Sequence, residues 1–457
     1  MWSVAGHKNK LALNTLIEKL MKNGCDNQKT LTHLTMSQPS TTNTLGIAVR
    51  AVTAFIVLPP DTNCWKSNIL EAVLFAGKLA NDIRAIYTVQ SLRIITNPFG
   101  EYLDTTTAES ALNGMEIIKS LLKDIEMEQI DLLQGTRIRF SIGAADANTL
   151  SLVPALVRSG GDLANCCINI PIDDNNVVDA DLIYHSAQVV KELGETTERG
   201  EGNFNFTINF NGPVLCPYFP AGFNTKEQGK SFVIGLEYPN LLVNILQNIA
   251  NTNTSHNEHW KNATHLMKTG IEQHLSVIVK KCRRAEGLKD ATFRFAGVDS
   301  SPAPSKSISS MCKVIELLGV PYFGASGTTE ACAMLTRVFK SVDQSSTNPV
   351  PLVGFSGLMF AALEDQGLAD AAAKGCYDIR NLLTYSAVCG IGLDTVPIPF
   401  DTSIDDIARL TADVGTMAYR LSKPLTVRLF PVPGKSAGEM TSFESDDLCN
   451  CTVFKVP

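Results

Sequence analysis

The sequence lacks the features that mark membrane and secreted proteins. It has no run of 18 apolar residues, and its first residues lack the apolar centre of a signal peptide. It also has no Cys-x-x-Cys pair, so its 12 scattered cysteines do not have zinc-site spacing. In a long chain, such cysteines are typical of free thiols in a reducing compartment. We therefore predict a cytoplasmic protein that has reduced cysteines and does not associate with a membrane.

Positive charge and histidine are also scarce. The net charge of -7 argues against nucleic acid as the main partner. His256, His259 and His265 are neighbours in sequence, but the carboxylate pattern of a metal site is missing around them. The loops that contain serine have no histidine, which disfavours a serine hydrolase triad. The sequence predicts no metal site and leaves the cofactor unknown. Its expected partner is a small-molecule ligand, and a homo-oligomer stays open.

The order of apolar segments indicates an α/β protein. Residues 1–43 are polar in their last part and predict a flexible N-terminal extension. From residue 45 on, β-branched runs alternate with helical patterns, which is typical of mainly parallel strands. No charged linker divides residues 45–457, so we predict a single domain. The expected strands include residues 47–57, 92–95, 137–142, 166–170, 203–210, 231–237, 291–298 and 425–430.

One stretch of twelve residues combines most of the chemically useful features. It reads Ser386-Ala-Val-Cys-Gly-Ile-Gly-Leu-Asp-Thr-Val-Pro397. Its apolar residues suit a buried strand, and its two glycines allow another group to approach the backbone closely. Asp394 is unusual there, because a carboxylate in an apolar setting is costly unless it is paired. Either Asp394 caps a neighbouring turn, or Cys389 and Asp394 reach the mouth of a barrel or sheet together.

Other strand ends also carry polar side chains. Asp299 follows an apolar strand and precedes Ser300, and Glu237 ends another strand. Such carboxylates face a site at the strand ends or cap the next turn. Gly324-Ala-Ser326-Gly-Thr-Thr328 begins a helix, where free amides favour an anion, although an ordinary helix cap explains it equally. Tyr218 and Phe219 lie in a proline-rich loop between two strands, and Ser356 lies in a second Gly-x-Ser-Gly turn.

Taken together, these blocks resemble the DUF711 family, also called UPF0210. The blocks are 217–223 with 234–237, 297–304, 323–328, 354–359 with 385–397, and 429–435. The resemblance covers about residues 45–457 and implies a ten-stranded α/β barrel related to that of pyruvate formate-lyase. A glycyl-radical segment is absent near the C-terminus, so we do not expect radical chemistry. Asn224 stands where a histidine is common in the family, which puts the conservation of any activity in doubt.

These observations lead to two hypotheses about function. In the first, the protein is a cytosolic lyase- or isomerase-type enzyme that uses carboxylate acid–base chemistry at the barrel mouth. Its catalytic residues would be Asp299, Asp394 and Glu237, with the Cys389 thiol as a further participant. In the second, the protein binds a small molecule without catalysis. In both, the expected ligand-binding residues are Tyr218, Phe219, Asn224, Ser300, Ser326, Thr328 and Ser356.

Overall fold

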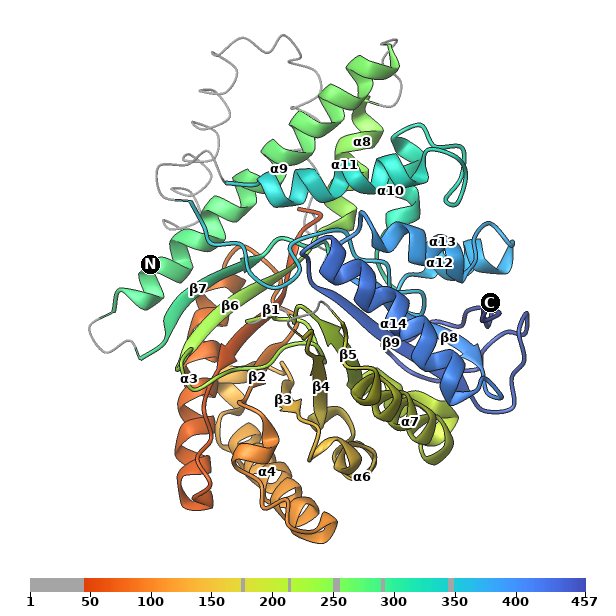
Figure 1. Cartoon of the computed structure of the whole chain (residues 1–457). Helices are drawn as coiled ribbons and strands as arrows, with labels where there is room; N and C mark the ends of the chain where they lie inside the picture. Colours follow the sequence, from red (N-terminus) through yellow and green to blue (C-terminus); the bar gives the residue numbers. More distant parts are fainter. Residues whose placement is uncertain (1–44, 174–176, 213–214, 250–254, 289–291, 344–348) are drawn as a thin grey trace. The chain divides into compact units, whose positions relative to one another are not determined.

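A computed structural model describes residues 45–457 except 174–176, 213–214, 250–254, 289–291 and 344–348 (Figure 1). The predicted extension 1–43 lies outside the described residues. Contacts between residues group Leu45–Pro457 into one compact unit, and a single domain remains our interpretation of it. Within the described residues, no helix has both the length and the apolar character needed to cross a bilayer.

The described strands form one nine-stranded sheet. Their order across the sheet is β7-β6-β1-β2-β3-β4-β5-β9-β8. In chain order, the strands are β1 (Ala48–Phe55), β2 (Leu92–Ile95), β3 (Ile138–Ala145), β4 (Asn165–Ile170), β5 (Phe206–Phe210), β6 (Ser231–Glu237), β7 (Arg294–Asp299), β8 (Gly392–Pro399) and β9 (Leu425–Val432).

The sheet consists of three parallel groups. Strands β1 to β5 run parallel to one another. The pairs β6–β7 and β8–β9 are each parallel internally. Both pairs run antiparallel to the central five, because β6 pairs antiparallel with β1 and β9 pairs antiparallel with β5. The predicted α/β fold with mainly parallel strands is therefore confirmed.

The ten-stranded barrel is not confirmed, because the sheet does not close between its edge strands β7 and β8. One segment, residues 352–361, makes an isolated parallel bridge to each edge, Val298 with Leu352 and Asp394 with Ala361. Between these bridges, the backbone takes positive φ angles at Gly354 (62°) and Ser356 (42°). Such angles are incompatible with a continuous extended strand. This segment therefore spans the gap as a loop.

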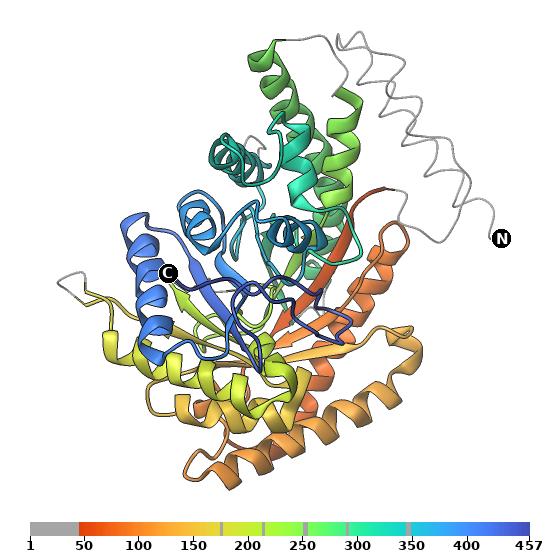
Figure 2. The ribbon, with the colours of Figure 1, turned by 90° about the vertical axis from the view of Figure 1, so that its right-hand side faces the viewer.

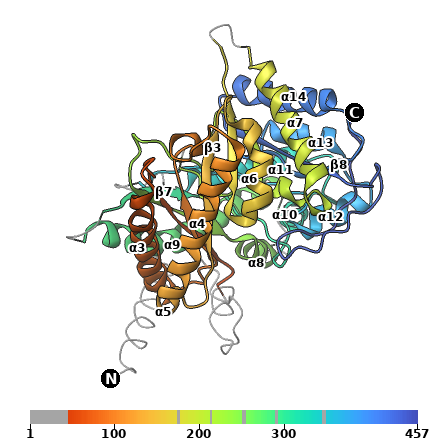
Figure 3. The same cartoon turned by 90° about the horizontal axis from the view of Figure 1, so that it is seen from below.

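The helices cover the outer face of the sheet and one of its ends. Figure 3 shows α3, α4, α6 and α7 side by side on the outer face, whereas α8, α9, α10 and α11 pack on one another (Figures 1 and 2). The helices are α3 (Trp65–Arg84), α4 (Ala108–Glu128), α5 (Ile130–Leu133), α6 (Val153–Gly160), α7 (Ala180–Thr196), α8 (Pro239–Ile249), α9 (His256–Glu286), α10 (Met311–Leu317), α11 (Thr328–Ser341), α12 (Gln366–Ala373), α13 (Ile379–Ser386) and α14 (Ile404–Arg420).

Helix α14 illustrates why these segments are helical. Its buried residues Ile407, Leu410, Val414 and Ala418 recur every three or four positions, which places them on one face. Ser403 caps its N-terminus by accepting a hydrogen bond from the backbone N–H of Asp406. The apolar face packs against α7, β5 and β9.

The two faces of the sheet differ in what they bury. Alternate strand residues point to opposite faces. The outer face contributes to the large core beneath the helices. The inner face carries a small separate cluster, which Phe219 and Val353 extend. That cluster consists of Phe55, Ile95, Leu215, Val233 and Ala296. The remaining inner face is more polar, and the candidate site lies there.

Candidate functional site

The connection between β5 and β6 crosses the inner face of the sheet. The Asn209 side chain on β5 donates to the Ala221 carbonyl at 3.1 Å. The Tyr218 hydroxyl donates to the Leu236 carbonyl at 3.0 Å. Asn224 donates to the Ile56 carbonyl at 2.9 Å and to the Gly229 carbonyl at 3.0 Å. These bonds to β5, to β6 and to the residue after β1 hold the proline-rich loop against the sheet, so that it forms a wall of the space beside it.

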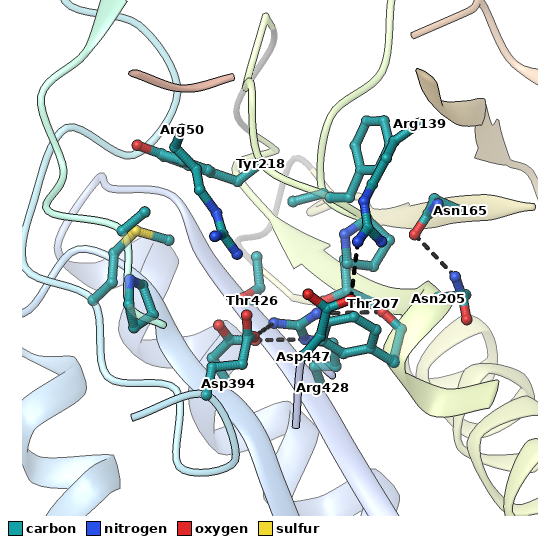
Figure 4. Close-up of a pocket in the computed structure, with 18 of the residues that line it drawn as sticks. Arg50, Arg139, Asn165, Asn205, Thr207, Tyr218, Asp394, Thr426, Arg428 and Asp447 are labelled. Atoms are coloured by element: carbon teal, nitrogen blue, oxygen red, sulfur yellow. Dashed lines mark hydrogen bonds and ion pairs between the residues drawn. The ribbon is translucent and has the colours of Figure 1, made fainter. Parts of the chain in front are cut away.

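That space is a cavity of about 130 Å³. Strands β1 to β5, β8 and β9 line it, together with the loop residues 218–221. Figure 4 shows Arg50 and Arg139 pointing toward a row formed by Asp394, Arg428 and Asp447. Its charged lining consists of the arginines Arg50, Arg93, Arg139 and Arg428 and the carboxylates Asp162, Glu364, Asp394 and Asp447.

Arg428 on β9 binds two carboxylates of this cavity. Its Nε lies 2.7 Å from Oδ1 of Asp394, and its Nη2 lies 2.5 Å from Oε1 of Glu364. All three side chains are buried or nearly so. Burial raises the pKa of the Glu364 carboxyl; Arg428 lowers it, and Asp394 raises it. Two carboxylates therefore compete for one arginine in a setting that favours a proton on Glu364.

A β-bulge aims Asp394 at Arg428. The pairing of β8 with β9 shifts between Leu393 and Val396, so Asp394 and Thr395 together oppose one residue of β9. Thr395 has φ of 46°, which is a strained value for a β-branched residue. The Leu363 N–H donates to Thr395 Oγ1 at 3.2 Å, and this bond brings Glu364 beside the bulge. The strain thus lies at the point where the two carboxylates meet.

The other lining arginines on β1 and β3 are also paired. Arg50 lies 3.3 Å from Glu237 Oε2 through its Nη1. Gln90 donates to the other oxygen of Glu237 at 2.6 Å. Burial raises the pKa of Glu237, whereas Arg50 and Gln90 lower it. Arg139 lies 3.0 Å from Asp447. Glu237 therefore does not line the cavity itself, but it contacts the lining residue Arg50.

Arg93 on β2 differs from these three arginines. It has no carboxylate partner among the described residues. Its Nε donates to Ser91 Oγ at 3.2 Å, its Nη1 donates to the Pro217 carbonyl at 3.0 Å, and its guanidinium lies 4.9 Å from the Phe219 ring centroid. Burial, Arg50 and Arg139 lower the pKa of Arg93 to about 9.

The structure brings only some of the predicted site residues to this cavity. Asp394, Tyr218 and Phe219 line it, and Glu237 binds the lining residue Arg50. Asn224 is not in the lining; it holds the loop through the two carbonyls given above. The presence of Asn224 where the family commonly has a histidine therefore does not change the lining of the cavity.

Asp299 is in a different environment and does not line the cavity. Its Oδ1 accepts from Ser301 N–H at 2.9 Å, Ser301 Oγ at 2.6 Å and Ser356 N–H at 3.0 Å, and its Oδ2 accepts from Phe355 N–H at 2.8 Å. Ser300 N–H donates to Ser356 Oγ at 3.2 Å. Burial raises the pKa of Asp299 to about 6, although its hydrogen bonds act in the opposite direction. These contacts match the local capping role that the sequence also allowed.

The remaining predicted residues lie away from the cavity lining. Ser326 is exposed. Thr328, the first residue of α11, donates to the Ala325 carbonyl at 2.7 Å and accepts from Gly324 N–H at 3.1 Å, so its hydroxyl holds the turn before the helix. Cys389 is buried, and its carbonyl accepts from Lys423 Nζ at 2.6 Å. A methyl group on Gly390 would lie 2.7 Å from Gly357 Cα, so this glycine serves close packing of two backbones.

Several lining residues were missed in the sequence, although a signal was present. Arg50, Arg93, Arg139 and Arg428 each interrupt an otherwise apolar strand. A charge in such a position is costly unless it is compensated, so the recurrence of this pattern in four strands marks the inner face. Glu364 has no comparable signal, because it lies in a loop before α12. No described cluster of His, Cys, Asp and Glu side chains has a metal-binding arrangement.

Comparison with known proteins gives the family but no activity. The model of a family described as "Uncharacterised ACR (DUF711)" matches residues 42–445. A UPF0210 protein of Carboxydothermus hydrogenoformans is 30% identical over 305 residues, which cover 65% of this chain and 64% of that protein. UPF0210 proteins of Bifidobacterium longum subsp. infantis (26% identical; 77% and 76% covered) and Methanopyrus kandleri (25% identical; 86% and 87% covered) are also similar. The chain thus belongs to the uncharacterised DUF711 (UPF0210) family.

Proposed function

We propose that this protein is an isomerase- or lyase-type enzyme that acts on a small molecule in the cavity beside Arg428. Glu364 is the residue that gives and takes the proton, and Asp394 and Arg428 hold it in place. The observation that carries this proposal is the pair of buried carboxylates on one arginine, at a strained bulge that opens to a cavity. Perturbed titration next to a specific charge partner in a cavity is typical of catalytic sites.

The chemistry follows from the raised pKa of the Glu364 carboxyl. A buried carboxyl with a raised pKa is suited to donate a proton near neutral pH and to take it back from the product. Arg428 binds both groups, so a shift of charge on one is felt by the other. The Cys389 thiol has no part in this proposal, because it does not line the cavity.

A non-catalytic binding protein is the second candidate. The observation that favours it is that Arg50, Arg139 and Arg428 are already paired with carboxylates, which fixes the cavity in advance. Preformed sites of this kind bind ligands without further ordering. The two candidates differ in one respect: only an enzyme exchanges carbon-bound protons of the ligand with solvent.

Deuterium incorporation separates these candidates. The purified protein is incubated in D₂O with a small-molecule extract and returned to H₂O, and mass spectrometry follows which compounds retain carbon-bound deuterium or change in amount. We expect one compound or one pair of compounds to change with the wild-type protein. Glu364→Gln should abolish the change, and the exposed control Glu109→Gln should retain it. Equal profiles with wild-type protein and Glu364→Gln would contradict the enzyme proposal.

We also propose that the protein works in the cytoplasm. The described cysteines are all free, and most of them are buried. Buried free thiols in this number fit a reducing compartment better than an oxidising one. A thiol titration under denaturing conditions tests this, and finding half or fewer of the 12 thiols free would oppose it.

A further inference from the structure

The unpaired cation Arg93 indicates what kind of group the cavity receives. The side chain is 8% exposed. Its Nη2 has no hydrogen-bond partner among the described residues, while Nε and Nη1 bind Ser91 and Pro217. A buried guanidinium without an acidic partner is costly. A carboxylate suits its planar fork and would complete its hydrogen bonds.

The charged neighbours of Arg93 increase the cost of burying its positive charge. Arg50 and Arg139 both act against its positive charge, whereas Tyr218 and, to a smaller degree, Glu364 favour it. Glu237 and Asp447 are already paired with Arg50 and Arg139, so these two acids do not compensate the charge of Arg93. Arg93 and Glu364 both line the same cavity.

Around Arg428, the carboxyl groups outnumber the arginine. Once Glu364 has given up its proton, Arg428 compensates only one of its two carboxylates, Glu364 and Asp394. An ammonium group of a ligand would balance the second carboxylate and could donate a hydrogen bond to it. The cavity therefore offers one uncompensated positive group, Arg93, and, with Glu364 ionised, one uncompensated negative group.

The size of the cavity limits the ligand. Its volume is about 130 Å³. A cavity of about 150 Å³ accommodates a benzene molecule, so the ligand here has a comparable number of non-hydrogen atoms. A small amino acid has this size.

We propose that the ligand is a small amino acid whose carboxylate binds Arg93 and whose ammonium group binds Glu364 and Asp394. This inference rests on the proposed function, because it names the substrate class of the same site. A phosphate fits less well, since a dianion would meet one unpaired arginine and several carboxylates. When the ammonium group binds there, the carbon-bound proton next to it lies on the side of Glu364.

Binding of simple probes to the wild-type protein tests this assignment. Calorimetric titration and thermal unfolding are measured with glycine, L-alanine, β-alanine, acetate, ethylamine and inorganic phosphate. We expect at least one of the amino acids to bind about 10-fold more tightly than acetate or ethylamine, because both charged groups contribute. The bound amino acid should raise the unfolding temperature. Acetate binding as tightly as every amino acid, tighter binding of phosphate, or no binding of any amino acid would each overturn the proposal.

Variants locate the two ends of the ligand. Arg93→Gln should weaken amino-acid binding by about 10-fold or more, and Arg93→Lys should recover part of it because it keeps the charge. The exposed control Arg137→Gln should bind like wild type. Glu364→Gln should weaken amino-acid binding but not acetate binding. If Arg93→Gln and Arg93→Lys each bind the amino acid as tightly as wild type, the assignment is overturned. If Arg93→Gln does not fold, unchanged amino-acid binding by Glu364→Gln would overturn it.

This outcome is separable from that of the proposed function. Deuterium incorporation into a compound without an amino group, with no amino-acid binding, would leave the enzyme proposal intact and refute the amino-acid ligand. Amino-acid binding without any deuterium incorporation would support the ligand and refute catalysis.

Discussion

Two buried carboxylates, Asp299 and Asp394, lie at opposite edges of the sheet and have different partners. Asp299 ends β7 and accepts four hydrogen bonds from loop residues, three of them from backbone N–H groups. Asp394 lies in β8 and binds the guanidinium of Arg428 at a cavity. Burial is common to both, so burial alone does not identify a functional acid. The kind of partner, and the access to a cavity, distinguish the two.

The carboxylate of Asp299 contacts mainly backbone groups. A methyl group on Gly354 would lie 2.1 Å from Asp299 Oδ2, so the loop backbone is in direct contact with the carboxylate. Asp299 is also fully buried. At Asp394, in contrast, the bulge with strained Thr395 turns a side chain toward open space. We infer that the first carboxylate stabilises the loop and the second serves the ligand.

Removing the Asp299 carboxylate should have the largest effect on stability. Asp299→Ala leaves three backbone N–H groups without their acceptor, and the expected loss is about 3–5 kcal/mol in the free energy of unfolding. Urea unfolding measures it. Asp394→Asn should lose less, because Glu364 still binds Arg428. Equal losses in the two variants would remove the distinction between these carboxylates.

The titration of Asp299 should also appear in the pH dependence of stability. Burial raises its folded pKa to about 6 from an ordinary value of 3.8. Its contribution is therefore fully present below pH 3.8 and is lost as pH rises through about 6. The stability of wild type relative to Asp299→Asn should fall by about 3 kcal/mol over this window. A difference that instead rises with pH would show that the hydrogen bonds outweigh burial.

Glu364→Gln should affect catalysis rather than stability. A positioned acid–base group contributes about 10²-fold or more to a rate, which corresponds to about 2.7 kcal/mol. The reaction found by deuterium incorporation should slow by at least this factor, while the urea midpoint changes little because glutamine still accepts a bond from Arg428. Asp299→Asn, measured below its own unfolding midpoint, serves as the comparison. Slowing in Asp299→Asn as great as in Glu364→Gln would break the contrast.

Substitutions at two residues with positive φ angles should change the stability least. Gln134 has φ of 50° at the exposed end of α5, so Gln134→Gly should stabilise the protein by about 0.5–1 kcal/mol. Thr395 has a similar φ of 46°, but its Oγ1 accepts from Leu363 N–H. Thr395→Gly should therefore lower stability despite the relief of strain. A gain in both variants would mean that the Thr395 contact contributes nothing.

The sequence predicted the layering better than the closure of the sheet. Apolar β-branched runs alternating with helical patterns correctly predicted an α/β fold with mainly parallel strands. Closure depends on whether 352–361 becomes a strand, and Gly354 and Ser356 decide this through backbone angles that local propensity does not determine. The antiparallel junctions β1–β6 and β5–β9 join strands far apart in sequence.

The candidate site could be predicted only in part for a related reason. Asp394 was identified because a carboxylate in an apolar strand is unusual. The same argument applies to Arg93 and Arg428, but their strands were interpreted from apolar residues alone. Glu364 meets Asp394 only because the Ala361 bridge and the Leu363 bond bring a distant loop to β8. No pattern of residue types announces such a contact.

The most direct measurement is mass spectrometry of small molecules that remain bound to purified protein. Wild type, Arg93→Gln and the control Arg137→Gln are prepared in parallel, and the molecules released by denaturation are identified. We predict a carboxylate-containing compound with an amino group in wild type and in Arg137→Gln, and its loss from Arg93→Gln. The same compound in equal yield from Arg93→Gln, or a retained compound without a carboxylate, would contradict the central claim that the cavity at Arg93, Glu364 and Asp394 is the functional site.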